Sequence, residues 1–347
     1  MKVIFRVLTL AVMTACAALL GINAEDAEAA EKVTWKLPMH HTTEESPVYK
    51  HSIMKIIDEV KEQSDGNFVI EPYLGGTLMP GTQLFTAVRR GMVPMVHTTP
   101  AYDLDEEPLF NILAGLPMNF AEVWEAAYFH KWLGFEQLVK DQLEKKHGLL
   151  YYSDRVYPTE LTLQKPVRSM EDFEGLKLRS SGILQKYLTS IGASAEMIPG
   201  GDIYPALASG MVEGAHWGAV QGAYAMGFYE VNDYHLRTPL NIAATDIWLI
   251  NKEAFEELPE EYQEILHTAL KEHFWPRTNQ YNYQEEMELQ RAIEKYDTEV
   301  ITLPDEEFKK MQKAAVEIWE DVAEKSPECA EAVEMIKEFN RDMGRLD

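Results

Sequence analysis

Apolar residues near the start of the chain alternate between two periods, and this alternation limits the fold more than any other feature. Residues 33–37, 68–72 and 93–97 have the pattern of short strands, whereas residues 47–63 and 81–90 have that of helices. In the first predicted helix, one apolar stripe recurs at helical spacing: Tyr49, Ile53, Ile56, Ile57 and Val60. Because such alternation is typical of a parallel sheet with crossover helices, we predict an α/β fold.

The 347 residues are enough for two domains. A strand predicted at 148–153 leads into the second domain, and an apolar strand at 247–250 leads back. We expect two α/β lobes, the second with the C-terminal helices: residues 30–153 plus 240–280, and residues 154–239 plus 281–347. Because the chain crosses between the lobes more than once, the hinge should contain several strands.

Residues 1–29 have the features of a cleaved signal peptide. Two basic residues precede an apolar core at residues 7–20, and Ala27-Glu28-Ala29 is a small-residue cleavage site. The core is shorter than a membrane span. A lipid anchor at Cys16 is disfavoured because apolar residues follow it. We therefore predict export to the periplasm.

The net charge of −25 argues against nucleic acids and anionic membranes as partners. Without residues 1–29, Cys329 is the only remaining cysteine, so the exported chain has no internal disulfide. Thiol catalysis by Cys329 is disfavoured because the acidic residues of its predicted helix raise a thiol pKa.

Arg179 ends a predicted strand, Gly175 to Arg179, and a turn follows at Ser180-Ser181-Gly182. Ligands of open α/β sheets bind at the carboxyl ends of strands. A guanidinium there can bind a carboxylate with two parallel hydrogen bonds. The alternative is a salt bridge at the surface or between domains.

Other candidate binding residues also lie near the ends of predicted strands or in small-residue segments. Tyr102 and Phe120 follow strand ends and are candidate pocket walls, although core packing is the commoner role for an aromatic side chain. The remaining candidates are Arg155, Tyr157, His216, Trp217, Gln221 and Asp246.

His40 and His41 follow the first predicted strand. A histidine pair suggests a metal ion, but adjacent strand residues point to opposite faces, so one site would have difficulty using both. We therefore predict no metal site, and regard these two residues as candidates for contact with a solute.

Several ordered motifs resemble the solute-binding proteins of TRAP (tripartite ATP-independent periplasmic) transporters. They are Asp65-Gly66-Asn67, residues 73–78, residues 98–102, residues 116–120, Gly175–Arg179, Ile198-Pro199 and residues 206–216. The resemblance covers roughly the exported chain. It implies a two-lobed, periplasmic-binding-protein-like fold with a long connecting helix, which closes on an organic acid and docks on membrane subunits.

The resemblance also implies roles for single residues. Arg179 would pair with the carboxylate of the solute. Some members hold a bridging cation with a Glu-Trp pair, which here reads His216-Trp217. Because hard cations prefer oxygen ligands, we expect neither a metal nor another cofactor. A second arginine found in some relatives is not in register with Arg155, which favours a monocarboxylate over a dicarboxylate.

Two other functions remain open at this point. A secreted hydrolase or lyase would act on an organic acid through Asp, Glu and His216, but no catalytic motif singles out such a site, so we predict no enzyme. A signalling protein that delivers its solute signal to a sensor kinase is the second alternative. The sequence does not choose between monomer and homodimer.

Overall fold

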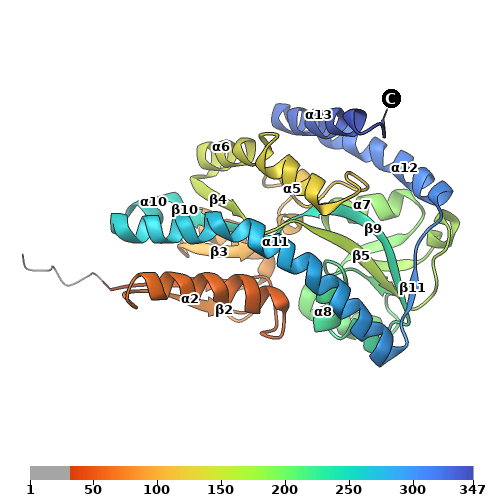
Figure 1. Ribbon diagram of the computed structural model, residues 1–347, viewed down its shortest axis with the longest axis horizontal. Coiled ribbons are helices and arrows are strands. Elements are labelled where there is room, and N and C mark those ends of the chain that lie inside the picture. The colour runs from red at the N-terminus through yellow and green to blue at the C-terminus, as the bar shows by residue number, and fades with distance from the viewer. Residues whose placement is uncertain (1–31, 347) are drawn as a thin grey trace, which may run out of the picture. The chain divides into compact units, whose positions relative to one another are not determined.

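The computed structural model describes residues 32–346, so the predicted signal peptide at 1–29 lies outside the described residues. Residues 33–347 form one unit, in which strands and helices build three sheets with helices packed on them (Figure 1). The predicted α/β fold is therefore confirmed.

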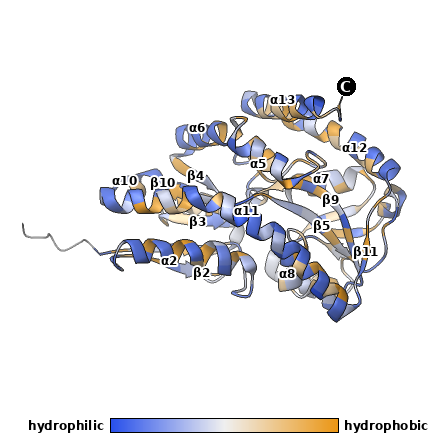
Figure 2. Ribbon diagram, in the orientation of Figure 1, coloured by the Kyte–Doolittle hydropathy of each residue, from blue (hydrophilic) through white to orange (hydrophobic). Residues whose placement is uncertain are grey.

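The first sheet joins β1 (Val33–Pro38) and β2 (Phe68–Tyr73) in parallel. Between them, a π-helical turn (Tyr49–Ile53) continues into α2 (Met54–Gln63). The predicted apolar stripe of α2 is buried against this sheet, as expected for a crossover helix. Figure 2 shows the contrast between hydrophobic and hydrophilic residues along α2.

The second sheet has the order β3-β10-β4, with β3 (Met95–Thr98), β10 (Ile247–Asn251) and β4 (Leu149–Ser153). β10 lies in the middle and is antiparallel to both neighbours. A single parallel bridge between Met39 and His97 links this sheet to the segment after β1. The apolar strand expected at 247–250 is therefore β10, the fully buried central strand of this sheet.

The third sheet has six strands in the order β11-β9-β5-β8-β6-β7. Their bounds are β5 (Tyr157–Leu163), β6 (Lys177–Ser180), β7 (Ser194–Met197), β8 (Gly214–Ala215), β9 (Tyr234–Ala244) and β11 (Glu299–Ile301). Strands β6 and β8 are parallel, whereas β5 is antiparallel to both β8 and β9. The strand predicted to contain Arg179 is confirmed as β6, although it continues to Ser180, and pairing places it between β7 and β8.

Helices cover these sheets. Those in the first half are α3 (Leu84–Arg89), α4 (Phe110–Leu113), α5 (Val123–Lys131), α6 (Phe135–His147) and α7 (Gly182–Ser190). Those in the second half are α8 (Gly200–Ala208), α9 (Val220–Ala225), α10 (Lys252–Glu256), α11 (Glu260–Tyr296), α12 (Asp305–Ala323) and α13 (Pro327–Asp342). Short 3₁₀ turns include η3 (Pro100–Tyr102).

Helix α11 has 37 residues and would span about 55 Å at 1.5 Å per residue. Its first half packs Tyr262 and Leu266 in the core beside α2, and its second half packs Leu289 and Ala292 in a core beside α8 and α9. Pro276 lies inside the helix between these halves. One element thus contributes to separate cores, and its course across the other elements is visible in Figure 1.

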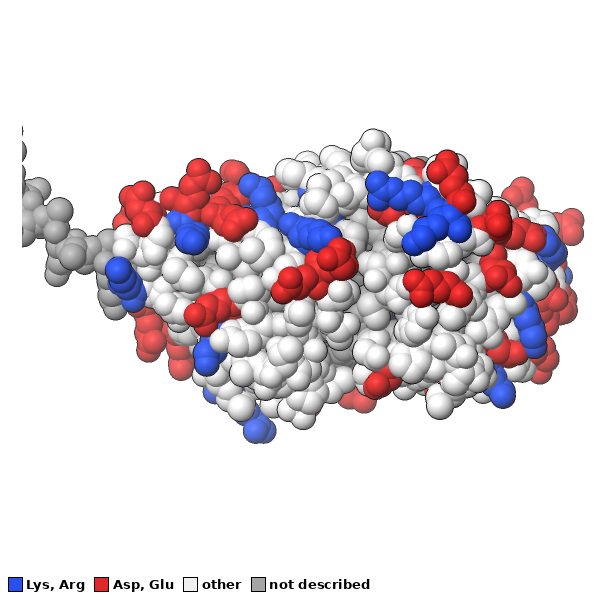
Figure 3. Space-filling view, turned by 90° about the horizontal axis from the view of Figure 1, so that it is seen from below, with Lys and Arg blue, Asp and Glu red and all other residues white. Residues whose placement is uncertain are grey.

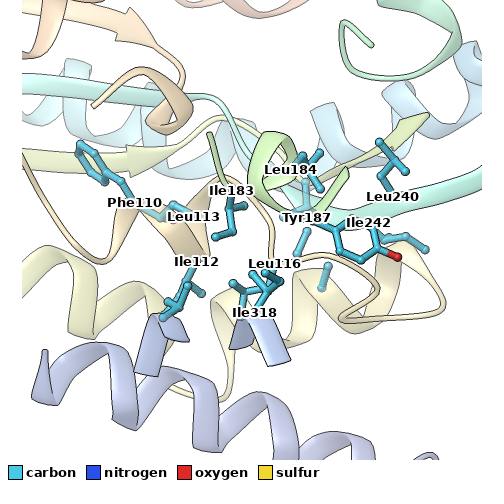
Figure 4. Close-up of a cluster of buried hydrophobic side chains, with 14 of the residues drawn as sticks. Phe110, Ile112, Leu113, Leu116, Ile183, Leu184, Tyr187, Leu240, Ile242 and Ile318 are labelled. Carbon is cyan, nitrogen blue, oxygen red and sulfur yellow. The ribbon is translucent and has the colours of Figure 1, made fainter. Parts of the chain in front are cut away.

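The largest core joins elements that are distant in the sequence. Figure 4 shows side chains from α4, α7, β9 and α12 meeting in one cluster. Its labelled members are Phe110, Ile112, Leu113, Leu116, Ile183, Leu184, Tyr187, Leu240, Ile242 and Ile318. The C-terminal helices are therefore part of the main core.

On the face drawn in Figure 3, basic side chains are scattered among acidic ones and form no single basic field. This distribution agrees with the acidic net charge and gives a nucleic-acid backbone no obvious footprint. Among residues 32–346, no helix combines the length and apolar character that crossing a bilayer requires.

Candidate functional site

A cavity of about 70 Å³ lies where β6 and η3 approach the segments after β1 and β4. Residues from α9, α11 and the end of β9 complete its wall. The sequence-predicted residues that line it are Tyr102, Arg155, Tyr157, Arg179, His216, Trp217, Gln221 and Asp246. The structure therefore brings together side chains that are up to 144 positions apart (Tyr102 to Asp246, 246 − 102).

Phe120 is not among the lining residues. Its ring packs against Phe129 and Phe339, at centroid distances of 5.3 and 5.5 Å. Trp319 and Asn340 donate hydrogen bonds to the carbonyls of the preceding segment, at Pro117 and Asn119. The expected pocket wall is thus a core residue, because the C-terminal helices hold this segment in the main core.

Arg179 is 2% exposed and faces the cavity from the end of β6. Its Nε donates to the Ile198 carbonyl at 2.9 Å, and one terminal nitrogen donates to the His216 carbonyl at 2.8 Å. No acidic side chain within residues 32–346 forms an ion pair with it. Burial lowers the pKa of Arg179, and nearby Tyr102 partly opposes this. The guanidinium is therefore fixed in orientation but has no counter-ion.

Arg155 is equally buried, but its charge is compensated. It forms ion pairs with Asp154 and with Asp246, the latter at 3.0 Å. Its guanidinium also lies 4.5 and 4.6 Å from the ring centroids of Tyr157 and Tyr281. Burial disfavours its charge, but the two carboxylates outweigh burial and raise the pKa.

The two acids around Arg155 are themselves held in place. Asp154 accepts hydrogen bonds from Ser52 and from the Trp248 indole, at 3.0 and 3.1 Å. Asp246 accepts one from the Tyr157 hydroxyl at 3.2 Å. Burial opposes ionisation of both acids, but Arg155 and histidine neighbours hold the pKa of each well below its usual value. This network fixes one wall of the cavity in a charged state.

Trp217 lies across the cavity with its ring centroid 5.3 Å from the Arg179 guanidinium carbon. Two glycines make room for it. A Cβ at Gly200 would lie 2.5 Å from the indole ring, and one at Gly222 would lie 1.7 Å from the Trp217 carbonyl oxygen. Gly200 and Gly222 thus allow a close approach to the tryptophan itself, whereas Gly214 and Gly218 face other residues.

His216 positions groups beside Arg179. Its carbonyl accepts from Arg179, and its Nε2 lies 2.9 Å from the Ser180 hydroxyl oxygen. Burial and the Arg179 charge keep the pKa of His216 well below its usual value. The imidazole is therefore neutral at pH 7.

Gln221 connects the cavity to α11. Its amide nitrogen donates to the Tyr281 carbonyl at 2.8 Å and to Glu285 at 2.9 Å. Its side-chain oxygen is buried without a hydrogen-bond partner among the described residues. The Gln221 side-chain oxygen is thus a hydrogen-bond acceptor in the cavity wall that is still available to a solute.

His40 and His41 both line the cavity, which corrects the expectation that neighbouring residues would face opposite ways. Their ring centroids are only 3.9 Å apart. The reason is that β1 ends at Pro38, so strand alternation no longer applies to the two histidines. Burial lowers the pKa of both imidazoles, although nearby Asp246 opposes this.

Sequence reasoning missed other lining residues. They include Thr99, Thr159, Ser181 and Tyr281. Ser181 and Thr99 lie in turns next to predicted strand ends, so their positions in the sequence could have identified them as candidate cavity residues. Tyr281 lies in the middle of α11, where nothing in the local pattern distinguishes a cavity residue from a core residue.

Comparison with known proteins places this fold and site in a family. A family model described as bacterial extracellular solute-binding protein, family 7, matches residues 39–326. A monocarboxylate 2-oxoacid-binding periplasmic protein of Nostoc sp. is 26% identical over 298 residues, covering 83% of this chain and 79% of the relative. The ectoine-binding periplasmic protein of Halomonas elongata is 22% identical over 293 residues, covering 82% of this chain and 83% of the relative.

Solved structures show the same fold. A TRAP transporter solute-binding protein from Bordetella bronchiseptica RB50, described with copurified calcium and picolinate, is 25% identical with a TM-score of 0.81, covering 90% of this chain and 93% of that one. A TRAP periplasmic solute-binding protein from Pseudoalteromonas atlantica T6c, described with sodium and pyruvate, has 22% identity and a TM-score of 0.81, covering 90% and 95%. The chain therefore belongs to family 7 of the bacterial extracellular solute-binding proteins, and its resemblance to TRAP transporter solute-binding proteins is confirmed.

Proposed function

We propose that this protein captures a small monocarboxylate in the cavity at Arg179 and delivers it to TRAP membrane subunits. One observation carries the proposal: Arg179 is buried against the cavity and has no acidic partner among the described residues. Removing an ion from water costs several kcal/mol unless an opposite charge compensates it. A carboxylate bound to the guanidinium would supply that charge.

The neighbouring arginine supports a solute with one carboxylate. Arg155 already has Asp154 and Asp246 as partners, so a second carboxylate would have to displace a buried ion pair. Truncating one partner of such a pair costs about 3–5 kcal/mol in proteins. A dicarboxylate would therefore gain little from Arg155.

The size of the cavity supports a small solute. Since one water needs about 10–15 Å³ of cavity volume, the 70 Å³ cavity would accommodate about five to seven water-sized groups. That number fits an acid of three or four carbons better than a sugar acid. The unused Gln221 oxygen and the imidazoles of His40 and His41 supply polar contacts for a second group on the solute.

We therefore assign the solute to the 2-oxo or 2-hydroxy monocarboxylates. The name of the Nostoc relative and the pyruvate described for one solved structure support this class. In this assignment Arg179 binds the carboxylate, Trp217 and Tyr102 cover it, and the polar side chains contact the 2-substituent. The family consists of binding proteins, so the hydrolase or lyase alternative is not favoured.

The division into lobes remains part of this proposal. The first lobe, residues 30–153 plus 240–280, would contain the β3-β10-β4 sheet, and the second, residues 154–239 plus 281–347, would contain the six-stranded sheet. β9 and α11 continue across the proposed boundaries and would form the hinge with the β4–β5 connection. We propose export through the 1–29 leader, as the periplasmic names of the relatives support. Transport is preferred over sensing for the same reason, and the oligomeric state stays open.

The test is isothermal titration of the purified protein with pyruvate and lactate, for the wild type and Arg179→Gln. The variant should fold, because no buried carboxylate is left behind when the guanidinium is removed. We expect it to lose about 2–5 kcal/mol of binding free energy, the usual cost of truncating one partner of a buried charge pair.

Arg168→Gln is the matched control, since Arg168 is 59% exposed and pairs with Glu299 at the surface. Its affinity should equal that of the wild type. Equal affinity in a well-folded Arg179→Gln protein would refute the assignment. Recovery of the bound acid chemically unchanged, checked by mass spectrometry, separates a binding protein from an enzyme.

A further inference from the structure

Three buried histidines form a cluster at one side of the cavity. His40 and His41 follow β1, and His97 lies in β3, which the Met39–His97 bridge holds beside them. The relative exposures of the three residues are 6, 5 and 0%. One potential ligand atom from each imidazole lies within 4.8 Å of the other two. The cluster is therefore built by the pairing of two segments that are distant in the sequence.

The ring nitrogens of this cluster are poorly satisfied. Nδ1 of all three histidines is buried with no hydrogen-bond partner among the described residues, and each Nε2 has a carboxylate oxygen at 3.4 to 3.8 Å. A buried polar atom without a partner typically costs about 1–3 kcal/mol, so several at one place indicate that something else occupies it. His130 shows the contrast: both its nitrogens are also unpartnered, but it packs among phenylalanine rings and belongs to no group of three potential ligands within residues 32–346.

We propose that His40, His41 and His97 bind a first-row transition-metal dication, for which Zn²⁺ is the reference. Neutral imidazole is a preferred ligand of Zn²⁺, Cu²⁺ and Ni²⁺. Three histidines with a fourth position open are a recurrent zinc arrangement. Nitrogens bound to one tetrahedral zinc are about 3.3 Å apart, as follows from a bond length near 2.0–2.1 Å. Since the three ligand atoms lie within 4.8 Å of one another, each pair would have to approach by at most about 1.5 Å on binding.

Carboxylates stand beside each imidazole. Asp246 oxygens lie 3.8 Å from Nε2 of His40 and 3.4 Å from Nε2 of His41, and an Asp154 oxygen lies 3.8 Å from Nε2 of His97. Metal-binding histidines usually have such a carboxylate neighbour, which orients the ring and raises its basicity as a ligand. The cluster thus has both the ligands and the groups that would orient them.

The open position would face the cavity, because His40 and His41 line it. Water or an anion there would be the fourth ligand. This site differs in chemistry from those of the calcium and sodium described for two solved structures, since hard cations take oxygen ligands. The inference rests on the histidines alone and holds whether or not the cavity binds a monocarboxylate.

The test is isothermal titration of the full chain, expressed without a histidine tag and stripped with a chelator, with ZnCl₂ and separately with CaCl₂. We expect one equivalent of Zn²⁺ and no Ca²⁺ at the histidines. His97→Gln and His40→Gln should each weaken Zn²⁺ binding by at least the 10–100-fold that loss of an outer-shell partner costs. Titration with Co²⁺ should give the intense visible absorption of tetrahedral nitrogen coordination in the wild type but not in His97→Gln or His40→Gln.

His51→Gln is the control for binding elsewhere, because His51 is partly exposed and bonds to Gln280 and Gln284 away from the cluster. It should bind Zn²⁺ as the wild type does. Arg179→Gln should also retain Zn²⁺ binding, which separates this result from the solute assignment. If His97→Gln does not fold, His40→Gln decides. Absence of Zn²⁺ binding in the wild type, or full binding in a folded His40→Gln protein, overturns the proposal.

Discussion

Arg155 and Arg179 line the same cavity and are equally buried, yet their charges have different surroundings. Arg155 meets the carboxylate of the residue before it and that of Asp246, which is 91 positions away (246 − 155). Arg179 meets carbonyls, an indole and the Tyr102 hydroxyl, but no carboxylate among the described residues. Two arginines near predicted strand ends look alike in the sequence. The difference is that the tertiary structure brings a distant carboxylate to Arg155 and none to Arg179.

Asp103, just after η3, should make stability depend on pH. Burial and nearby Glu106 raise the pKa of Asp103 to about 7, although Arg89 opposes this. One of its carboxyl oxygens is buried without a partner. The native state therefore binds more protons than the unfolded chain between about pH 4 and pH 7, and this carboxyl's contribution to stability is lost as the pH rises through that window.

Asp103→Asn removes this ionisation. Relative to the wild type, the variant should gain up to roughly 4 kcal/mol of unfolding free energy between pH 4 and pH 8, from a pKa shift of about three units. Urea unfolding across this range measures the difference. Exposed Asp105→Asn is the control and should show no such pH trend. Parallel stability curves for Asp103→Asn and the wild type would contradict the prediction.

At the scale of elements, the packing of α9 against Trp217 requires a residue without a side chain. Gly222 of this helix lies so close to the Trp217 carbonyl that a Cβ would be 1.7 Å from its oxygen. Alanine normally stabilises a helix relative to glycine. At this position, however, the backbone carbonyl of Trp217 occupies the space that the alanine Cβ would need. Gly222→Ala should therefore cost about 1–3 kcal/mol or more of stability and should weaken acid binding by displacing Trp217.

Gly201→Ala is the matched comparison, because no heavy atom lies within 4 Å of its Cβ position in α8. That variant should gain about 0.5–1 kcal/mol and bind the acid normally. Urea unfolding and titration calorimetry measure the two effects. If both variants behaved alike, the close approach of α9 to Trp217 would not matter for the site.

Local sequence patterns predicted the helices and strands better than they predicted which strands pair with one another. The stripe of α2 and the strand that contains Arg179 follow from periodicity alone. The position of β10 between β3 and β4, and the two-residue β8 between β5 and β6, depend on pairing between distant segments, which no local pattern reveals. The same limit explains the site: Tyr281 and the paired histidines reach the cavity through contacts that only the assembled fold creates.

At the scale of the whole molecule, binding the acid should stabilise the entire fold. A ligand at a hundredfold excess over Kd adds about 2.7 kcal/mol to the unfolding free energy when it binds only the native state. Pyruvate or lactate should therefore raise the unfolding midpoint of the wild type in calorimetry. The neutral amide of the same acid should not, because it brings no charge to Arg179. A shift of equal size with the amide would be the contrary outcome.

The long helix α11 connects the cavity with separate hydrophobic cores. It contributes Tyr262 and Leu266 to one core, Tyr281 to the cavity wall, and Leu289 and Ala292 to another core. Glu285 on the same helix accepts hydrogen bonds from backbone groups of α9. The cavity wall, two separate cores and the hydrogen bonds to α9 thus all depend on one continuous helix.

The unpaired guanidinium of Arg179 has a consequence for what an empty site means. A fixed buried cation without a counter-ion attracts any small anion that fits the cavity, and chloride is such an anion. Capture of the solute is then an exchange of one anion for another, and the observed affinity is the difference between two binding free energies. The salt composition of the surroundings therefore sets the concentration of acid at which this receptor fills.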